Sequence, residues 1–368
     1  MKTVQRLLYK EIIQAVVFVA CGFLALFVFF DLVEELQNLT RMAAAGYRLQ
    51  HGLIQVALKA PGHLYELMPI SVLIGTIFVM ARLAQSSEFT ILRTGGLEPT
   101  KALAILLQLG VGFVLLTFLL GDYMAPWAER QSTLLKAQFR GALSTGQTGA
   151  WLKERTATTH AAVNVKALDD KAHMVGVRIH QFNAQGQLLA ITQAAKGEFA
   201  PGTWQLTDVE QSQLKGQGSD TITQITVSRT ARLDWPTNIT ADMVAAALLS
   251  PEQMKIWDLF LYTRHLSRNN QNAQQYEIQL WRKVFYPLSC LVMLTLALPF
   301  AYLHFRSGQI AGHVFGGVMA GISFYLLNNV FGHIGNLQNW VPWITSAAPS
   351  LLYTLMSLAA FAWMVNKQ

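Results

Sequence analysis

The sequence is poor in charged residues, and this scarcity is its most informative feature. Charged side chains make up 13% of the 368 residues, against about 25% in an average soluble domain. Hydrophobic residues make up 52%, and the mean hydropathy is +0.31. The composition therefore disfavours an ordinary soluble domain and favours a membrane protein.

Cysteine is almost absent as well. The only two, Cys21 and Cys290, both lie inside apolar runs. A disulfide between them is not expected, and two such residues do not indicate a redox compartment.

Several motifs that would indicate catalysis are missing. The sequence has no phosphate-binding G-x-x-x-x-G-K-[ST], no H-E-x-x-H, no closely spaced cysteine pair and no EF-hand loop. The chain is therefore not itself a P-loop ATPase, and an enzyme is a weak hypothesis. The net charge of +7 suits anionic lipid headgroups. Nucleic acid is not expected, because no basic stripe with interleaved aromatic residues occurs.

Long apolar runs are present, and six are long enough to cross a bilayer, which takes about 20 residues of helix. They cover residues 12–36, 61–83, 102–124, 284–303, 310–331 and 340–365. The first run is too long for a signal peptide and has no small-residue cleavage site, so we expect it to be retained.

The basic residues near the spans predict that both termini lie in the cytoplasm. Three precede the first span, three lie between the second and third, and none lies between the fifth and sixth. The six are Lys2, Arg6, Lys10, Arg82, Arg93 and Lys101. The loop 37–60, assigned to the outside, opposes this orientation with Arg41, Arg48 and Lys59.

The segment between the third and fourth spans is too polar to cross a membrane. Alternating apolar and polar residues predict strands over 160–167, 174–182, 203–207 and 221–233, with turns at 183–186 and 201–202. Strands spaced about ten residues apart suggest a sandwich or jelly roll. Residues 254–279 are expected to return to the membrane as a helix that starts near 250–253.

The cytoplasmic loop 82–96 predicts a short amphipathic helix. Glu88 falls in its first turn, where a carboxylate suits the helix dipole, and a glycine pair ends it. Phe89 and Leu92 form an apolar edge. Two interpretations remain open: a helix that lies at the membrane surface, or one that docks into a groove on a cytoplasmic ATPase.

Several motifs resemble the LptF/LptG family of permeases of the lipopolysaccharide exporter. They are residues 83–97 (LAQSSEFTILRTGGL), 281–289 (WRKVFYPLS), 321–325 (GISFY) and 329–332 (NVFG). Three spans on either side of a β-rich insert also match, so the resemblance covers essentially the whole chain. The motifs after residue 280 are more similar to the G-type permease than to the F-type.

The resemblance implies an α-helical polytopic membrane protein of a Gram-negative inner membrane. Residues 1–124 would hold three transmembrane helices and a coupling helix at 84–95, 125–278 a periplasmic β-jelly-roll domain, and 279–368 three further helices. The implied partners are a homologous F-type permease, a cytoplasmic ATPase dimer, a single-span accessory subunit with a jelly-roll domain and a periplasmic bridge protein. ATP and Mg²⁺ would be used by the ATPase, with no cofactor or metal bound by this chain.

The resemblance also implies site residues. Glu88, Phe89, Leu92 and Arg93 would contact the ATPase. Basic residues would bind the phosphates of lipid A, as Arg and Lys commonly do; the candidates are Arg130, Lys136, Arg140 and Arg306. A solvated helix face and a cytoplasmic anchor are the alternatives for these residues.

Two other features bear on function. The end of the first span carries Asp31, Glu34 and Glu35 where the family pattern offers lysines, so a phosphate contact is not expected there. The fifth span has glycines four residues apart, which allow close helix packing. They are Gly312, Gly316, Gly317 and Gly321.

The leading hypothesis is a permease subunit that extracts lipopolysaccharide from the inner membrane. The alternative is a membrane-anchored periplasmic receptor or assembly protein without transport activity. An intramembrane enzyme using Asp31, Glu34, Glu35 and His63 is weaker still, because no nucleophile is fixed.

Overall fold

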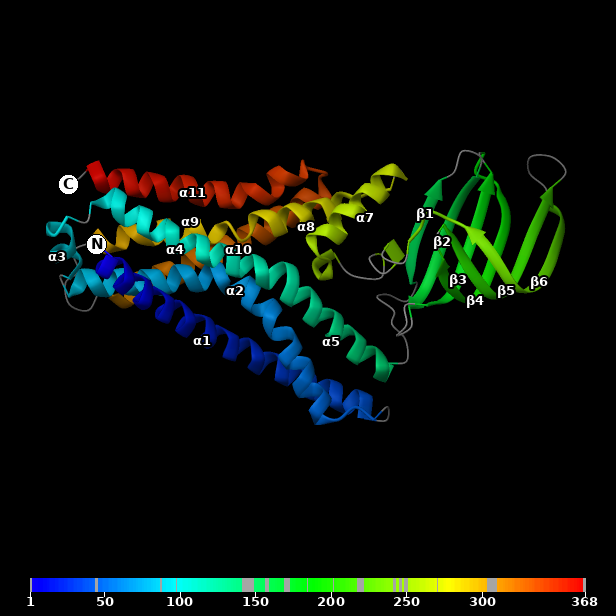
Figure 1. The fold of residues 1–368 in the computed structure, drawn as a ribbon, viewed down its shortest axis with the longest axis horizontal. Helices are drawn as coiled ribbons and strands as arrows, with labels where there is room; N and C mark the ends of the chain where they lie inside the picture. Colours follow the sequence, from blue (N-terminus) through cyan, green and yellow to red (C-terminus); the bar gives the residue numbers. More distant parts are fainter. Residues whose placement is uncertain are drawn as a thin grey trace. The chain divides into compact units, whose positions relative to one another are not determined.

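The computed structural model divides the chain into two compact units. The membrane unit comprises residues 1–132 and 277–368, and the β unit comprises residues 133–276 (Figure 1). The structure describes residues 2–43, 46–86, 88–96, 98–140, 149–155, 159–168, 173–183, 185–200, 202–216, 222–240, 243–244, 247, 251–269, 271–302 and 310–366.

Helices form the membrane unit, and two of them continue across its boundaries at residues 132 and 277 into the β unit. Their bounds are α1 Lys2–Met42, α2 Leu49–Gln85, α3 Glu88–Thr94, α4 Pro99–Leu119, α5 Ala125–Arg140, α8 Gln274–Phe285, α9 Ser289–Ala297, α10 Ile310–Leu337 and α11 Pro342–Asn366. A π-helical turn, η2 (Leu120–Met124), joins α4 to α5, and a 3-10 turn, η4 (Leu298–Tyr302), follows α9. Helices α1 and α2 begin well before the apolar runs that predict them, which start at residues 12 and 61.

Within the described residues, five helical stretches are long and apolar enough to cross a membrane, and a sixth span is present if α8 and α9 are counted as one. The prediction of one continuous span over 284–303 is therefore corrected: the two helices bend by 46° at residues 286–288. Pro287 explains the break, because it has no N–H and its ring clashes with the preceding turn. The backbone tightens here, and the amides of Leu288 and Ser289 bond the carbonyls of Phe285 and Tyr286.

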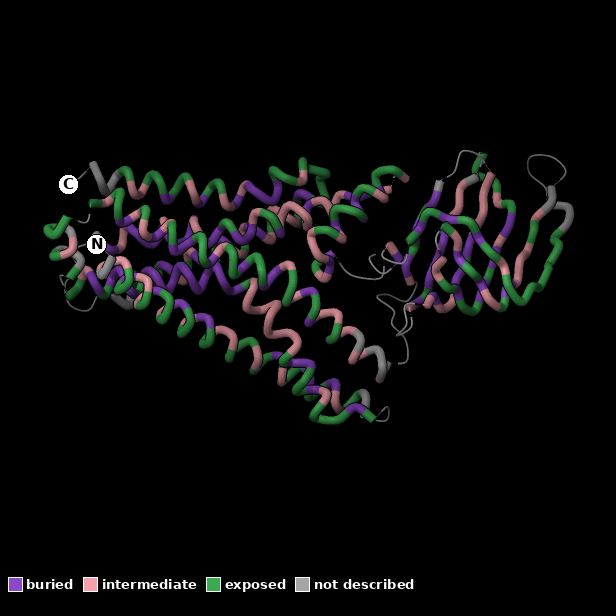
Figure 2. Tube along the Cα trace, viewed as in Figure 1, coloured by how far each residue is buried: buried purple, intermediate pink, exposed green. Residues whose placement is uncertain are grey.

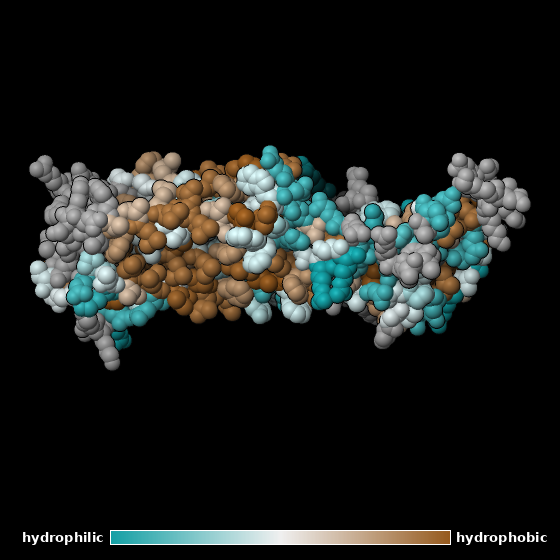
Figure 3. All heavy atoms as spheres, turned by 90° about the horizontal axis from the view of Figure 1, so that it is seen from above, coloured by the Kyte–Doolittle hydropathy of each residue, from teal (hydrophilic) through white to brown (hydrophobic). Residues whose placement is uncertain are grey.

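Helix α2 is the central helix of this unit. In its most apolar stretch 83% of the residues are buried, whereas in that of α1 only 17% are buried (Figure 2). The core of the unit includes Leu73, Ile77, Leu106, Met293 and Phe324, all nearly inaccessible. On the face seen in Figure 3, hydrophobic residues form a continuous patch over these helices. An apolar exterior of this kind suits contact with lipid.

Six antiparallel strands form the sheet of the β unit. They are β1 Ala150–Arg155, β2 Thr159–Leu168, β3 Met174–Asn183, β4 Leu188–Ala200, β5 Thr203–Gly216 and β6 Ile222–Pro236. Each strand pairs with its neighbour in sequence, in the order β1 to β6. The predicted β-rich insert is thus confirmed. Among the described strands, however, the order is that of a meander, without the Greek-key crossover of a jelly roll.

Strand residues alternate between two faces of the sheet. Val163, Val165, Ile179 and Leu206 are at most about 1% exposed and belong to the core face, where Trp204 packs edge-on against Trp235. The predicted return helix over 254–279 divides into α7 (Ile256–Arg268) and α8. A 3-10 turn, η3 (Pro251–Gln253), stands where a helix start is predicted.

Candidate functional site

The short helix α3 forms where the sequence predicts a coupling helix, although it is confined to Glu88–Thr94. Its end is fixed by the glycine pair: the Gly95 amide bonds the carbonyl of Ile91 at 2.9 Å, and Gly96 adopts a φ of +98° that favours glycine. Ser86 is the C-terminal cap residue of α2. The Glu88 carboxylate is exposed in the first turn.

Two apolar residues of α3 point in different directions. Leu92 is half-buried and packs against the core of the membrane unit, where Leu83 is also buried. Ile91 is 68% exposed, and the sequence analysis does not single it out. The side chains of Phe89 and Arg93 lie outside the described residues. The described surface of α3 therefore offers one carboxylate, Glu88, and one apolar side chain, Ile91, to a partner.

The predicted phosphate-binding residues share one helix. Arg130, Lys136 and Arg140 all lie on α5, with Arg130 and Lys136 half-buried. Lys136 and Arg140 are four positions apart in the sequence, so both positions lie on one face of the helix. The side chain of Arg140 and all of Arg306 lie outside the described residues.

The acidic end of α1 is neutralised by α2. One oxygen of Asp31 lies 2.9 Å from Lys59 Nζ, and the other lies 2.7 Å from His63 Nε2. Glu34 reaches the same lysine at 3.3 Å. Asp31 is thus engaged through both oxygens in contacts between helices, which does not support a role for it as a catalytic acid.

Glu35, which is 2% exposed, is also used internally. Its carboxylate accepts hydrogen bonds from the Tyr47 hydroxyl at 2.5 Å and from the Asn38 amide at 3.1 Å. The bond from Tyr47 fastens the end of α1 to the segment that leads into α2, whereas the bond from Asn38 lies within α1. Asp31 and Glu34 therefore hold α1 to α2, and Glu35 holds α1 to the segment before α2.

Two sequence motifs that are far apart in the chain meet at the break between α8 and α9. The Arg282 guanidinium donates to the side-chain oxygen of Asn329 on α10 at 2.6 Å. Tyr286, next to Pro287, donates its hydroxyl proton to the carbonyl of Glu66 on α2 at 2.6 Å. The region around the break is thus joined to α10 by Arg282 and to α2 by Tyr286.

Lys283 is the most buried cation of this region, with 5% of its surface exposed. Its ammonium donates to the carbonyl of Gly121, in the π-helical turn η2, at 3.3 Å. The lysine therefore places its charge against a backbone carbonyl of this turn. Arg282 and Lys283 belong to the motif at residues 281–289, but the sequence alone indicates no role for either.

The glycines of α10 divide into two faces. A Cβ on Gly317 would collide with Ile77 of α2, and one on Gly321 would lie 3.2 Å from a methyl group of Ile70. Among the described residues, no neighbouring atom lies within 4 Å of such a position at Gly312 or Gly316. Gly317 and Gly321 therefore serve packing inside the membrane unit, whereas Gly312 and Gly316 leave an open surface.

These features define a class: a polytopic membrane protein with a short helix in the loop between two spans, a broken span and an inserted antiparallel sheet. The sequence model of the family described as "Lipopolysaccharide export system permease LptF/LptG" matches residues 6–363. The chain belongs to this family.

Individual relatives agree with the family assignment. The lipopolysaccharide export system permease protein LptG of Escherichia coli strain K12 is 28% identical over 331 residues, 89% of each chain. The LptG protein of Haemophilus influenzae strain KW20 Rd is 26% identical over 359 residues, 96% of each chain. The resemblance inferred from the motifs, including its preference for the G-type branch, is confirmed.

Proposed function

We propose that this chain is an LptG-type permease subunit of a lipopolysaccharide exporter. The observation that carries this function is the family match over residues 6–363, which includes both the membrane unit and the β unit. Relatives named as LptG permeases match along nearly the same length. A membrane-anchored receptor without transport is not favoured, because the family is described as a permease.

The permease does not hydrolyse ATP in this proposal. A cytoplasmic ATPase dimer binds ATP and Mg²⁺, and its movement reaches the membrane unit through α3. The exposed Glu88 and Ile91 support this role, because a helix in a groove needs a polar contact and an apolar anchor. Leu92 packs inward and would transmit the movement to the core of the membrane unit.

Lipopolysaccharide enters laterally from the outer leaflet of the inner membrane, into a cavity shared with a homologous F-type permease. Arg130, Lys136 and Arg140 meet the lipid A phosphates, because they are cations on one helix. The open face at Gly312 and Gly316 allows close approach of a partner helix. The periplasmic β unit then passes the lipid to the jelly roll of a single-span subunit and to a bridge protein.

The coupling role of α3 is tested by Glu88→Lys in a depletion strain. We expect loss of complementation and at least a tenfold fall in lipopolysaccharide release, with the protein still in the membrane. Glu198→Lys, an exposed carboxylate on β4, is the matched control and should complement. Full complementation by Glu88→Lys would remove this carboxylate from the coupling site.

The phosphate contact is tested by replacing Arg130, Lys136 and Arg140 together with glutamine. A charged hydrogen bond is worth about 1.5–3 kcal/mol when partly desolvated, so the triple variant should lose far more crosslinking to lipopolysaccharide than any single one. A photo-crosslinker at position 136 should capture the lipid. Normal transport by the triple variant, with no crosslink at 136, would assign recognition to another surface.

A further inference from the structure

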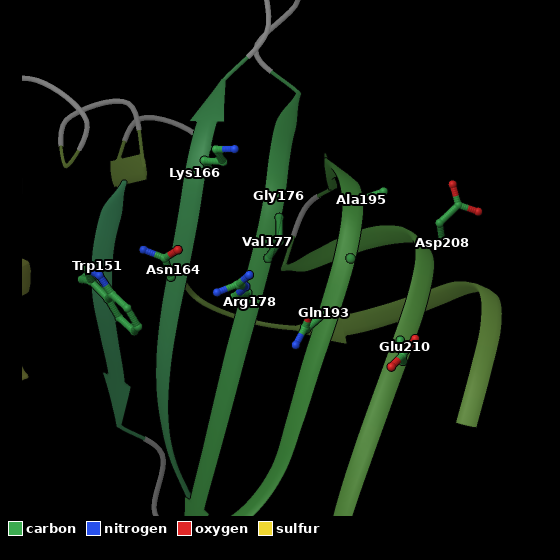
Figure 4. Close-up of a pocket in the computed structure, with 11 residues that line it drawn as sticks. Trp151, Asn164, Lys166, Gly176, Val177, Arg178, Gln193, Ala195, Asp208 and Glu210 are labelled. Carbon is green, nitrogen blue, oxygen red and sulfur yellow. The ribbon is translucent and has the colours of Figure 1, made fainter. Parts of the chain in front are cut away.

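The sheet of the β unit has a groove of about 660 Å³ that the proposed transport mechanism does not use (Figure 4). Its exposed lining residues alternate along the strands with residues of the core face. Trp151, for example, is 50% exposed, whereas the next residue, Leu152, is 1% exposed. The groove therefore lies on the polar face of the sheet, opposite the apolar core.

One row of side chains crosses five strands in register along this groove. Each member is the direct partner of the next across β1 to β5, and Figure 4 shows their side chains along the groove. The row is Trp151, Asn164, Arg178, Gln193 and Glu210. Neighbouring strands lie about 4.8 Å apart, so the row is about 19 Å long.

Backbone distortions deepen the groove beside this row. Gly176 has a φ of +66° and Asp208 a φ of +54°, and a positive φ at a residue other than glycine is uncommon. A Cβ on Gly176 would lie 3.1 Å from Cβ of Lys166. Gly176 and Ala195 are small lining residues, which leaves room for a hollow on this face of the sheet.

The lining offers both hydrogen-bond donors and acceptors. Lys166 and Arg178 balance Asp208 and Glu210 in charge, which does not favour a strongly anionic ligand such as a phosphate. Glu210 pairs with Arg229 at 3.0 Å. Within the part of the chain that the structure describes, Arg178 and Gln193 form no side-chain hydrogen bond.

A half-exposed indole beside amide, carboxylate and guanidinium groups matches one ligand chemistry. A sugar ring presents hydroxyl groups that both donate and accept, and a face of C–H groups that packs on an aromatic ring. We propose that this groove binds a saccharide. Resting on the proposed function, the saccharide is the oligosaccharide part of lipopolysaccharide or the glycan of the cell wall, which share this chemistry.

The experiment uses the full chain in lipid nanodiscs and two probes. One is the oligosaccharide released from lipopolysaccharide by mild acid, and the other is soluble cell-wall glycan. Titration calorimetry on the wild type should detect at least one of them. Trp151→Ala, and Ala195→Trp, which fills the groove, should each raise Kd at least tenfold. Gln193→Ala should raise Kd, whereas Gln205→Ala, an exposed amide on β5 outside the groove, should not.

The two probes identify the source of the ligand, because binding of either one alone, or of both, supports the groove as a saccharide site. Absence of binding to the wild type, or binding unchanged by Trp151→Ala and Ala195→Trp, overturns it. Lipopolysaccharide release by the assembled exporter is measured in parallel. Release without saccharide binding means that only the groove inference fails, whereas no release by the wild-type exporter means that the proposed function fails.

Discussion

At the scale of single residues, two neighbouring glycines of α10 have different surroundings: Gly317 packs against α2, whereas Gly316 is exposed. Gly317→Val should destabilise the membrane unit by about 1–3 kcal/mol, the usual effect of overpacking a close contact, because the new side chain meets Ile77 of α2. Thermal unfolding of the purified protein measures this loss.

Gly316→Val is the matched control, since it adds the same side chain one residue earlier, where no atom of the described residues lies within 4 Å. It should leave the melting temperature of the isolated chain unchanged. If Gly316 faces the second permease, the same variant should reduce co-purification of that partner. Equal melting temperatures for both variants would contradict the division of α10 into two faces.

A second residue links stability to pH. Burial lowers the pKa of His265 on α7 from its ordinary 6.5, although Glu154 acts in the opposite direction. The unfolded chain therefore takes up a proton near pH 6.5, and the folded protein only at lower pH. The stability due to neutral His265 is complete above pH 6.5 and is lost as the pH falls below it.

The expected loss is about 1.4 kcal/mol for each unit by which the pKa is lowered. Unfolding of the β unit, followed at pH 7.5 and 5.5, should show a smaller difference in His265→Asn than in the wild type. An identical pH dependence in both would mean that other groups govern it.

At the scale of elements, α3 combines an inward and an outward apolar residue. Ile91→Asp should leave the melting temperature unchanged, because Ile91 is 68% exposed, but it should reduce co-purification of the ATPase. Leu92→Asp should lower the melting temperature, because Leu92 packs against the core. Retention of the ATPase by Ile91→Asp would show that the exposed side of α3 is not its contact.

The ends of α1 and α2 depend on each other through the Asp31–Lys59 pair, whose side chains are 10% and 21% exposed. Lys59→Met should destabilise the protein by about 1–3 kcal/mol, between the values for exposed and buried pairs. Asp31→Asn together with Lys59→Met should be less destabilising than the sum of the single changes. Additive effects in this double-mutant cycle would show that the pair does not couple the helices.

The elements also show how far sequence reasoning reaches. Four strands were predicted near their observed positions because their residues alternate, and α3 was predicted from Glu88 and the glycine pair. The sequence analysis does not predict strands β1 and β4. Strand β4 fills the interval between the two predicted turns, so those turns could have indicated a strand there. The break at Pro287 was missed because apolar composition continues through it, so hydropathy alone does not detect it.

The contacts between distant residues were beyond sequence reasoning. Arg282 and Asn329 belong to two quoted motifs, but only folding brings them to 2.6 Å. In the sequence, Asp31 is an acid at the end of the first span and Lys59 is a basic residue in a loop assigned to the outside, and nothing connects them. The fold places α1 beside α2, and the two side chains then form an ion pair. Periodicity identifies the face of a helix, whereas the partner of that face depends on the tertiary fold.

At the scale of the whole molecule, the orientation in the membrane remains a prediction: both termini in the cytoplasm, with residues 125–278 on the other side. The structure places the three basic residues of loop 37–60 in or beside α1 and α2. Arg41 lies in the last turn of α1 and Arg48 caps α2. Lys59 lies within α2, where Asp31 and Glu34 offset its charge. The positive-inside rule counts Lys and Arg whether or not acids lie beside them, so these three residues still oppose the basic flanks on the cytoplasmic side.

Single cysteines test this orientation on a background in which Cys21 and Cys290 are replaced by alanine. Thr94→Cys lies on α3 and Gln185→Cys in the turn before β4, and both positions are exposed. An impermeant maleimide added to intact spheroplasts should label position 185 and not position 94, and detergent should make both reactive. Labelling at 94 alone would invert the orientation. It would place α3 away from any cytoplasmic ATPase, and Glu88→Lys would then have no coupling to disrupt.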